Sequence, residues 1–440
     1  MADKNKDQPR PLNLSAQLAS KQPEGIDLKA IEDGTITCPK GFRAAGYHAG
    51  FRPDPNRLDA ALVLADELCS AAGVFTKNVF CAAPVIVSRE HLNGTGAGTA
   101  RAVIINSGIA NAATGELGLQ KARQTSEIVA NVVGCAAEDV LVASTGVIGQ
   151  QLDMVPFESG VPALFDIAED SIQKGHDAAR AIMTTDTVPK ESAFSYVSND
   201  PALAGTCISV GGMVKGSGMI MPNMATMIAV ITTDAPVPSN LAHEALLEAA
   251  NKSFNKVTVD SDTSTNDTCF LLCSGKAAPG LEITRESLAF SEFKAALQAV
   301  CTSLARKIAE DGEGASKLVT VNVAGAANDA DADLAARAIA NSPLVKTAIF
   351  GHDCNWGRIA AAAGKSGAQF DQRKCSIDIM GMPVCREGLD VAFSEEEALR
   401  RFEDREIVID VYLGAGDAST TIWTCDFTHE YVTINGDYRS

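Results

Sequence analysis

A threonine directly follows a small alanine at the point where a polar break gives way to an apolar run. Ala225 and Thr226 lie in the segment GMIMPNMATMIAV (218–230), just after Pro222 and at the start of a β-prone stretch. A threonine hydroxyl is a weak nucleophile at neutral pH, and a base next to it activates it. An α-amino group can be that base when the threonine begins a chain, because its pKa is about 7.7–8.0.

An internal threonine gains such an amine if the peptide bond before it is cut. The hydroxyl of Thr226 can attack the carbonyl of Ala225 and move the acyl group from nitrogen to oxygen, and the small Ala225 leaves room for the tetrahedral intermediate. The residues by themselves permit this chemistry without requiring it, because most Ala-Thr pairs at strand starts are structural.

Four further stretches are dense in small polar residues. They are NSGIANAATG (106–115), VDSDTSTNDT (259–268), DGEG (311–314) and GHDCNWGR (351–358). Turn formation accounts for any one of them, because Asp, Asn, Ser and Thr bond their own backbone and Gly supplies positive φ. Four such stretches at predicted strand ends indicate the rim of a site.

The elements that must position these residues alternate between short apolar runs and amphipathic helical patterns. That alternation predicts an α/β layered fold. Strands are expected at 101–106, 140–145, 256–260, 269–273 and 318–325, and helices at 121–134, 239–254 and 290–312. We expect Gly134 to end the first helix and Ser239 to cap the second.

Composition and missing motifs exclude several classes of function. The formal net charge of −18 leaves no basic surplus for nucleic-acid phosphates. No apolar run approaches the about 18 residues of a membrane span, and the N-terminus is polar, without an apolar signal core. The twelve cysteines form no CxxC pair, and HExxH, GxSxG and phosphate-loop spacings are absent. We expect a reduced, cytoplasmic protein that binds no metal and acts without a catalytic histidine.

Several long motifs in order resemble one enzyme family. KGSGMIMPNMATMIAVITTDA (215–235) resembles the self-cleaving segment of the ornithine acetyltransferases, the glutamate N-acetyltransferases of arginine biosynthesis. The resemblance continues through AIMTTDTVPK (181–190), VDSDTSTNDT, ARKIAEDGEGASK (305–317), NWGRIAAAAG (355–364) and TCDFTHEYVTINGDYRS (424–440). It covers nearly the whole chain from about residue 35.

The resemblance implies a layered α/β sandwich that is related to, but distinct from, the N-terminal-nucleophile hydrolases. It implies a cut before Thr226, so that a tail (1–35) precedes an α chain (36–225) and a β chain (226–440). Thr226 would accept an acetyl group from N2-acetylornithine and pass it to glutamate through an acetyl-threonine intermediate. The oxyanion donors would be the hydroxyl of Thr145 and the backbone N–H of Gly146.

The family's substrate contacts match six residues of this chain: Thr184, Lys215, Thr226, Glu313, Asn435 and Ser440. Glu313 can pair with an ammonium group, and Lys215 with a carboxylate or with the nucleophile. The resemblance implies amino-acid substrates, no cofactor, and a heterotetramer of two α and two β chains. Acetyl-CoA is a candidate second donor, on which the sequence is silent.

The chain departs from the family pattern at four positions, Ile109, Ala113, His352 and Cys354, and none is the nucleophile or an oxyanion donor. Two other readings stay open at this point. An N-terminal-nucleophile aminopeptidase or amidohydrolase would use the same cut threonine and give the acyl group to water. A binding protein with a degenerate site would keep its full length.

Overall fold

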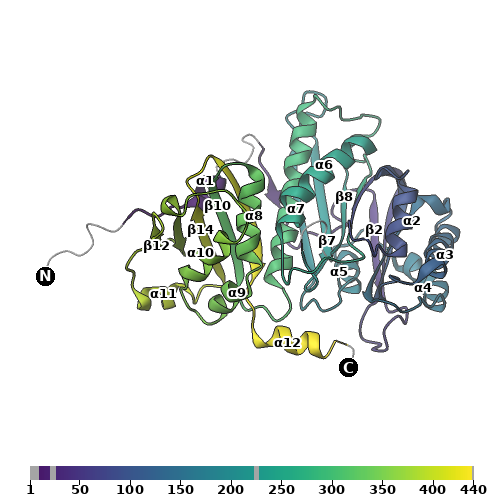
Figure 1. Ribbon diagram of the computed structural model, residues 1–440. Helices are drawn as coiled ribbons and strands as arrows, with labels where there is room; N and C mark the ends of the chain where they lie inside the picture. Colours follow the sequence, from purple (N-terminus) through teal and green to yellow (C-terminus); the bar gives the residue numbers. More distant parts are fainter. Residues whose placement is uncertain (1–8, 20–25, 222–226, 439–440) are drawn as a thin grey trace. The chain divides into compact units, whose positions relative to one another are not determined.

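The computed structural model describes residues 9–19, 26–221 and 227–438, and the chain divides into two compact units. The large unit comprises Gly25–Asn255 and Asp262–Ile308, and the small unit comprises Met1–Glu24, Lys256–Ser261 and Ala309–Ser440. Figure 1 follows the chain through both. The predicted residues Ala225, Thr226 and Ser440 lie outside the described residues.

The large unit is built on a mixed sheet that contains nine strands in the described part of the chain, in the order β1-β6-β7-β8-β9-β3-β4-β5, with β2 paired to β3. The strands are β1 (Lys29–Ala30), β2 (Phe42–Tyr47), β3 (Ala60–Phe75), β4 (Ala97–Ile109), β5 (Val140–Val147), β6 (Lys190–Val197), β7 (Cys207–Lys215), β8 (Ile228–Thr233) and β9 (Thr268–Cys273). The helices are α2 (Ala83–His91), α3 (Gly115–Val133), α4 (Val155–Ile167), α5 (Ile172–Ala181), α6 (Ser239–Lys252) and α7 (Leu288–Glu310), whose last two residues belong to the small unit, and a 3-10 turn spans Ala137–Asp139.

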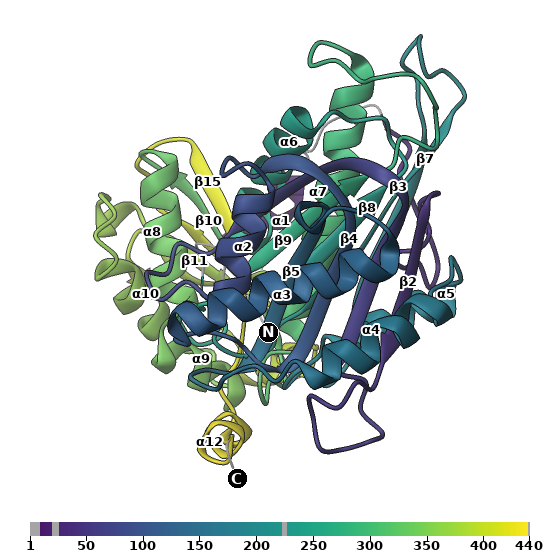
Figure 2. The same ribbon diagram turned by 90° about the vertical axis from the view of Figure 1, so that its right-hand side faces the viewer.

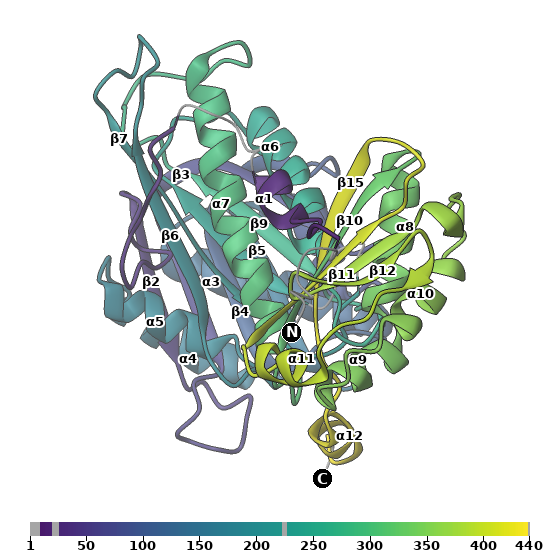
Figure 3. The ribbon, with the colours of Figure 1, turned by 90° about the vertical axis from the view of Figure 1, so that its left-hand side faces the viewer.

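The long strand β3 lies between β9 and β4 and so connects the two halves of this sheet. It runs for 16 residues and shifts register against β4 between Leu64 and Cys69; its second half also pairs with β9. One buried core contains side chains from strands on both sides of β3, such as Val103 and Leu141 together with Val230. Helices α2, α3 and α4 cover β2–β5 through a second core (Figure 2), and α7 packs against β7 on the other side of the unit (Figure 3).

The small unit carries a mixed sheet of six described strands in the order β13-β12-β11-β14-β10-β15. They are β10 (Leu318–Ala326), β11 (Ser376–Ile379), β12 (Met382–Arg386), β13 (Leu389–Asp390), β14 (Glu406–Tyr412) and β15 (Ala418–Cys425). The helices are α1 (Leu14–Ala19), α8 (Asp329–Ala340), α9 (Pro343–Phe350), α10 (Trp356–Gly364), α11 (Glu395–Arg401) and α12 (His429–Gly436), with a 3-10 turn at Gln372–Lys374. A further 3-10 turn, Phe254–Lys256, begins in the large unit, and its last residue belongs to the small unit.

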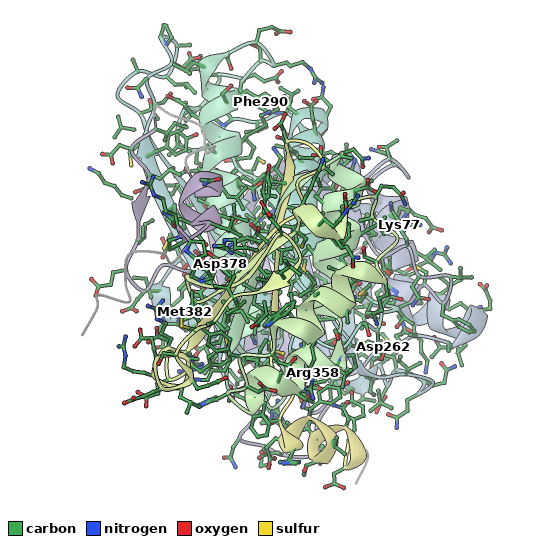
Figure 4. All side chains as sticks on the ribbon, turned by 60° about the vertical axis from the view of Figure 1, so that its left-hand side comes forward. Lys77, Asp262, Phe290, Arg358, Asp378 and Met382 are labelled. Carbon is green, nitrogen blue, oxygen red and sulfur yellow. The ribbon has the colours of Figure 1, made fainter. Side chains whose placement is uncertain are left out.

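The predicted N-terminal tail includes residues that belong to the small unit. The amides of Leu12 and Leu14 donate to the carboxylates of Asp378 (2.7 Å) and Asp410 (3.1 Å), and Leu14 is buried. Asp378 lies on β11 (Figure 4). No helix in the described ranges is long and apolar enough to cross a membrane.

Most of the local predictions are confirmed, and two are wrong. Gly134 ends α3 in the left-handed conformation, with a φ of 78°. Residues 256–260 form no strand, because Val257 makes a single parallel bridge to Trp423 before the chain turns away at Ser261, whose φ is 67°. Ser239 is the first residue of α6 rather than its cap; Pro238 occupies the cap position and makes no side-chain cap.

Candidate functional site

The predicted oxyanion pair lies at the end of β5, where that strand runs parallel to β4. Thr145 is 4% exposed, and the register pairs Gly108 with Gly146. A Cβ atom on Gly146 would stand 2.2 Å from the carbonyl carbon of Gly108, and its φ is +132°. Only glycine fits this backbone and this close approach, so the structure requires a glycine at position 146.

Asn266 ties that strand end to the loop before β9. Its side-chain amide donates to the carbonyl oxygens of Ala110 (2.6 Å) and Ser144 (2.8 Å), and its oxygen accepts from the hydroxyl of Thr265 (2.5 Å). Ser144 immediately precedes the predicted oxyanion pair. A buried amide with three partners fixes the backbone that it contacts.

The next residue, Asp267, reaches the other predicted part of the site. Its carboxylate accepts the backbone N–H of Met227 at 3.0 Å, and Met227 directly follows Thr226. Asp267 is 0% exposed, and burial raises the pKa of its carboxyl well above the ordinary range. The hydrogen bond from Met227 and the interactions with Lys215 and Ser264 oppose that rise in pKa without cancelling it.

Lys215 ends β7 and stands opposite Ile228, two residues after Thr226. It is 2% exposed, so its charge lies inside the protein. That charge acts on Asp267 and on a second buried carboxylate, Asp186.

Asp186 gathers four donors. It accepts the amide (2.9 Å) and the hydroxyl (3.4 Å) of Thr184, the amide of Gly216 (2.7 Å), and the ammonium of Lys190 (2.6 Å). Burial alone would raise the pKa of Asp186, but the charges of Lys190 and Lys215 hold it below its ordinary range. The predicted residues Thr184 and Lys215 are therefore linked through a carboxylate.

Two other predicted contacts lie in the small unit. Glu313 is buried, and its carboxylate accepts a hydrogen bond of 2.7 Å from the side-chain amide of Asn435 on α12. Thr428 caps the N-terminus of helix α12: its hydroxyl accepts the amide of Glu430 and donates to the carbonyl of Gly314. The α12 helix is thus fixed to the loop that carries Glu313.

The described site residues thus form two groups. The strand-end group lies in the large unit and contains Thr145, Gly146, Thr184, Asp186, Lys215, Asn266 and Asp267; the α12 group lies in the small unit and contains Glu313 and Asn435. Among the four departures from the family pattern, Ile109 ends β4 beside the strand-end group, whereas Cys354 is buried in the small unit's core.

Three residues of the strand-end group were missed by sequence reasoning. Asp186, Asn266 and Asp267 stand inside the motifs AIMTTDTVPK and VDSDTSTNDT, but turn chemistry explained those residue types equally well. No metal-binding group of three or more His, Cys, Asp or Glu occurs in the ranges that the structure describes.

Comparison with known proteins identifies the family. The ArgJ family matches residues 43–440. The arginine biosynthesis bifunctional protein ArgJ of Chlorobaculum tepidum is 48% identical over 402 residues, covering 91% of this chain and 96% of that protein. The protein of the same name from Symbiobacterium thermophilum is 45% identical over 408 residues, covering 92% and 99%.

Among solved structures, the arginine biosynthesis bifunctional protein ArgJ of Bacillus halodurans is 38% identical. That alignment covers 46% of this chain and all of the other, with a TM-score of 0.42. The sequence relationship spans nine-tenths of the chain, and it agrees with the resemblance in the site motifs. The chain belongs to the ArgJ family and is an acetyltransferase of arginine biosynthesis.

Proposed function

We propose that the protein cuts itself between Ala225 and Thr226 and then transfers an acetyl group from N2-acetylornithine to glutamate. The hydroxyl of Thr226 attacks the carbonyl of Ala225, the amide nitrogen leaves as the new α-amine, and water hydrolyses the resulting ester. The α-amine of Thr226 then serves as base for its own hydroxyl. The acetyl group passes to that hydroxyl, ornithine leaves, and the amine of glutamate takes the acetyl group from the threonine.

The oxyanion of each acyl-transfer step is assigned to the hydroxyl of Thr145 and the backbone N–H of Gly146. One observation carries this assignment: Asn266 bonds the carbonyl before Thr145, while its neighbour Asp267 bonds the amide after Thr226. Two adjacent residues thus contact the strand with the expected donors and the residue beside the expected nucleophile. Donors that are fixed before the reaction stabilise charge that develops in the transition state.

Charge complementarity supports the substrate contacts. We assign the buried ammonium of Lys215 to a substrate carboxylate or to the nucleophile, and the hydroxyl of Thr184 to a substrate polar group. Glu313, with Asn435 bonded to it, is assigned to an ammonium group of ornithine. Ser440 is assigned to the same substrate from the C-terminus.

The cut is tested by mass and by substitution. Intact-mass analysis should show two chains whose masses sum to the precursor plus one water, with Thr226 beginning the second. Thr226→Ala should remain at full length. A second chain that begins at another residue would remove Thr226 as the nucleophile.

The transfer is tested by assays with glutamate and each donor in turn, acetylornithine and acetyl-CoA. N-acetylglutamate formed from acetylornithine supports the proposal, and free acetate in place of it would favour an amidohydrolase. N-acetylglutamate formed from acetyl-CoA would add the second donor. We further propose a cytoplasmic heterotetramer of two α and two β chains, which light scattering of the mature protein and cell fractionation test.

A further inference from the structure

Both backbone hydrogen-bonding groups of Met227 are paired with residues at the start of β9 or directly before it. Its N–H donates to the carboxylate of Asp267 at 3.0 Å, and its carbonyl accepts the N–H of Thr268 at 3.1 Å. Met227 is buried, so water cannot replace these partners. The backbone N–H and carbonyl of Met227 therefore have fixed positions.

The neighbouring side chain holds the opposite strand in the same way. The amide of Asn266 donates to two backbone carbonyls, of Ala110 and Ser144, and the residue is 5% exposed. Because Asn266 and Asp267 are consecutive, a shift of either contact moves the other. The pair therefore links the end of β5 to the start of β8.

We propose that Asn266 and Asp267 act together as positioning residues for the nucleophile and its oxyanion donors, an inference that rests on the proposed function. Self-cleavage makes this link more important. Before the cut, Thr226 is held by peptide bonds on both sides; after it, the bond to Met227 is the single covalent connection. The hydrogen bond to Asp267 then fixes the orientation of the new terminus.

The acceptor of this hydrogen bond is a buried carboxyl whose pKa burial raises. Asparagine resembles the protonated form of such a carboxyl in shape and charge, and its oxygen can still accept the N–H of Met227. Asp267→Asn therefore keeps the positioning contact, whereas Asp267→Ala removes it.

A matched control exists at the other end of β8. Asp234 is also buried, and its carboxylate accepts the amides of Ser209 (2.8 Å) and Lys40 (3.2 Å). Burial raises the pKa of Asp234 as well. Asp234→Ala thus removes a similar structural contact far along the strand from Met227.

The first experiment measures the rate of self-cleavage, and kcat and KM for acetylornithine, in these variants. Asp267→Ala should lower both rates about a hundredfold, the loss expected from a misplacement of about 1 Å, while KM stays close to wild type. Asp267→Asn should recover most of the loss, and Asp234→Ala should keep the wild-type kcat. Wild-type rates in Asp267→Ala, an equal loss in Asp267→Asn, or an equal loss in Asp234→Ala would each overturn the proposal.

The second experiment is a double-mutant cycle that combines Asn266→Ala with Thr145→Ala, and it serves equally if Asp267→Ala fails to fold. If Asn266 acts through the oxyanion donors, removing it should lower kcat only slightly in a protein that already lacks the Thr145 hydroxyl. The loss in the double variant should then be smaller than the product of the two single losses. Multiplying losses would mean that Asn266 acts only on general stability, and would overturn its role.

These outcomes are separable from a failure of the proposed function. If Thr226→Ala were still cut, the proposed nucleophile would be wrong, whatever Asp267 does. If the wild type is cut and transfers acetyl groups while Asp267→Ala does the same at full rate, the proposed function stands and the positioning role fails.

Discussion

The strand-end group and the α12 group differ in how firmly the protein holds them. In the strand-end group, Lys215, Asn266 and Asp267 are each at most 5% exposed. In the α12 group, Asn435 lies on an exposed helix, and its amide contacts the buried Glu313. A buried site whose backbone is held by hydrogen bonds can stabilise a transition state without rearranging. An exposed helix suits a substrate that must enter and leave.

Within the strand-end group, the two buried carboxyl groups also differ in their pKa. Asp186 and Asp267 are both buried near Lys215, yet the pKa of the first is lowered and that of the second is raised. Asp186 also has the ammonium of Lys190 at 2.6 Å and accepts two backbone amides, whereas Asp267 accepts one. Burial sets the cost of a charge, and the second cation, Lys190, lowers the pKa of Asp186 far enough for its charge to persist. Substitutions at five positions test this difference between the two groups.

The largest effect is expected from Lys190→Met, which leaves the carboxylate of Asp186 without its bonded cation. Removal of one partner from a buried ion pair costs about 3–5 kcal/mol in the free energy of unfolding. Urea denaturation measures it. Lys252→Met is the control, because its pair with Glu248 on α6 is exposed and should contribute at most about 1 kcal/mol. A loss as small as the control's would show that the Asp186 cluster does not depend on the pair.

Thr145→Ala should lower kcat by about a hundredfold to a thousandfold with little change in KM, because an oxyanion donor acts mainly in the transition state. Steady-state assays with acetylornithine and glutamate measure both. Thr233→Ala removes an equally buried threonine at the other end of β8, where its hydroxyl donates to Ser209, and should keep the wild-type kcat. An unchanged kcat in Thr145→Ala would leave that residue a purely structural strand end.

Stability against pH should separate the two buried carboxyls. The unfolded chain loses the proton of Asp267 near pH 3.9, while the folded protein keeps it to a higher pH. The wild type therefore loses up to about 1.4 kcal/mol of unfolding free energy per pH unit as the pH rises through that window. Asp267→Asn lacks this loss, so its stability relative to wild type should rise with pH in urea titrations. A constant difference between the two proteins would contradict the raised pKa.

Asp186 has the opposite linkage. Because its folded pKa is lowered, its contribution to stability is present above the unfolded pKa and is lost as the pH falls through the folded value. The free energy of unfolding of Asp186→Asn should therefore approach that of the wild type as the pH falls. For Asp267→Asn, the stability relative to wild type rises as the pH rises, which is the opposite trend.

Local patterns in the sequence predicted most of the elements but not their pairing. Periodicity placed the strands at 101–106 and 140–145 and the helix that ends at Gly134, because each depends on residues close in the chain. The order of the nine strands and the register shift in β3 arise from contacts between distant segments. Residues 256–260 show why local patterns are insufficient. Their sequence is typical of a strand, but Val257 alone pairs with another segment, so no strand forms.

The same limit applies to the site. The motifs supplied Thr145, Gly146, Thr184 and Lys215, whose residue types match the family's chemistry. The link from Asn266 to Ser144 joins residues 122 positions apart, and no spacing rule predicts it. A turn residue and a positioning residue look alike in sequence, because both are small and polar. They differ in what they contact across the fold.

The smallest effect should come from the α12 group. Asn435→Ala removes one hydrogen bond to Glu313 from a helix that is otherwise exposed. If this amide orients Glu313 toward an ammonium group, the loss should be about 1 kcal/mol, which is about fivefold in KM for acetylornithine, with kcat and self-cleavage close to wild type. Thr433→Ala, on the same helix and exposed, is the control. A fall in kcat without a change in KM would place Asn435 with the strand-end group in function, and would erase the difference between a region that performs the chemistry and a region that holds the substrate.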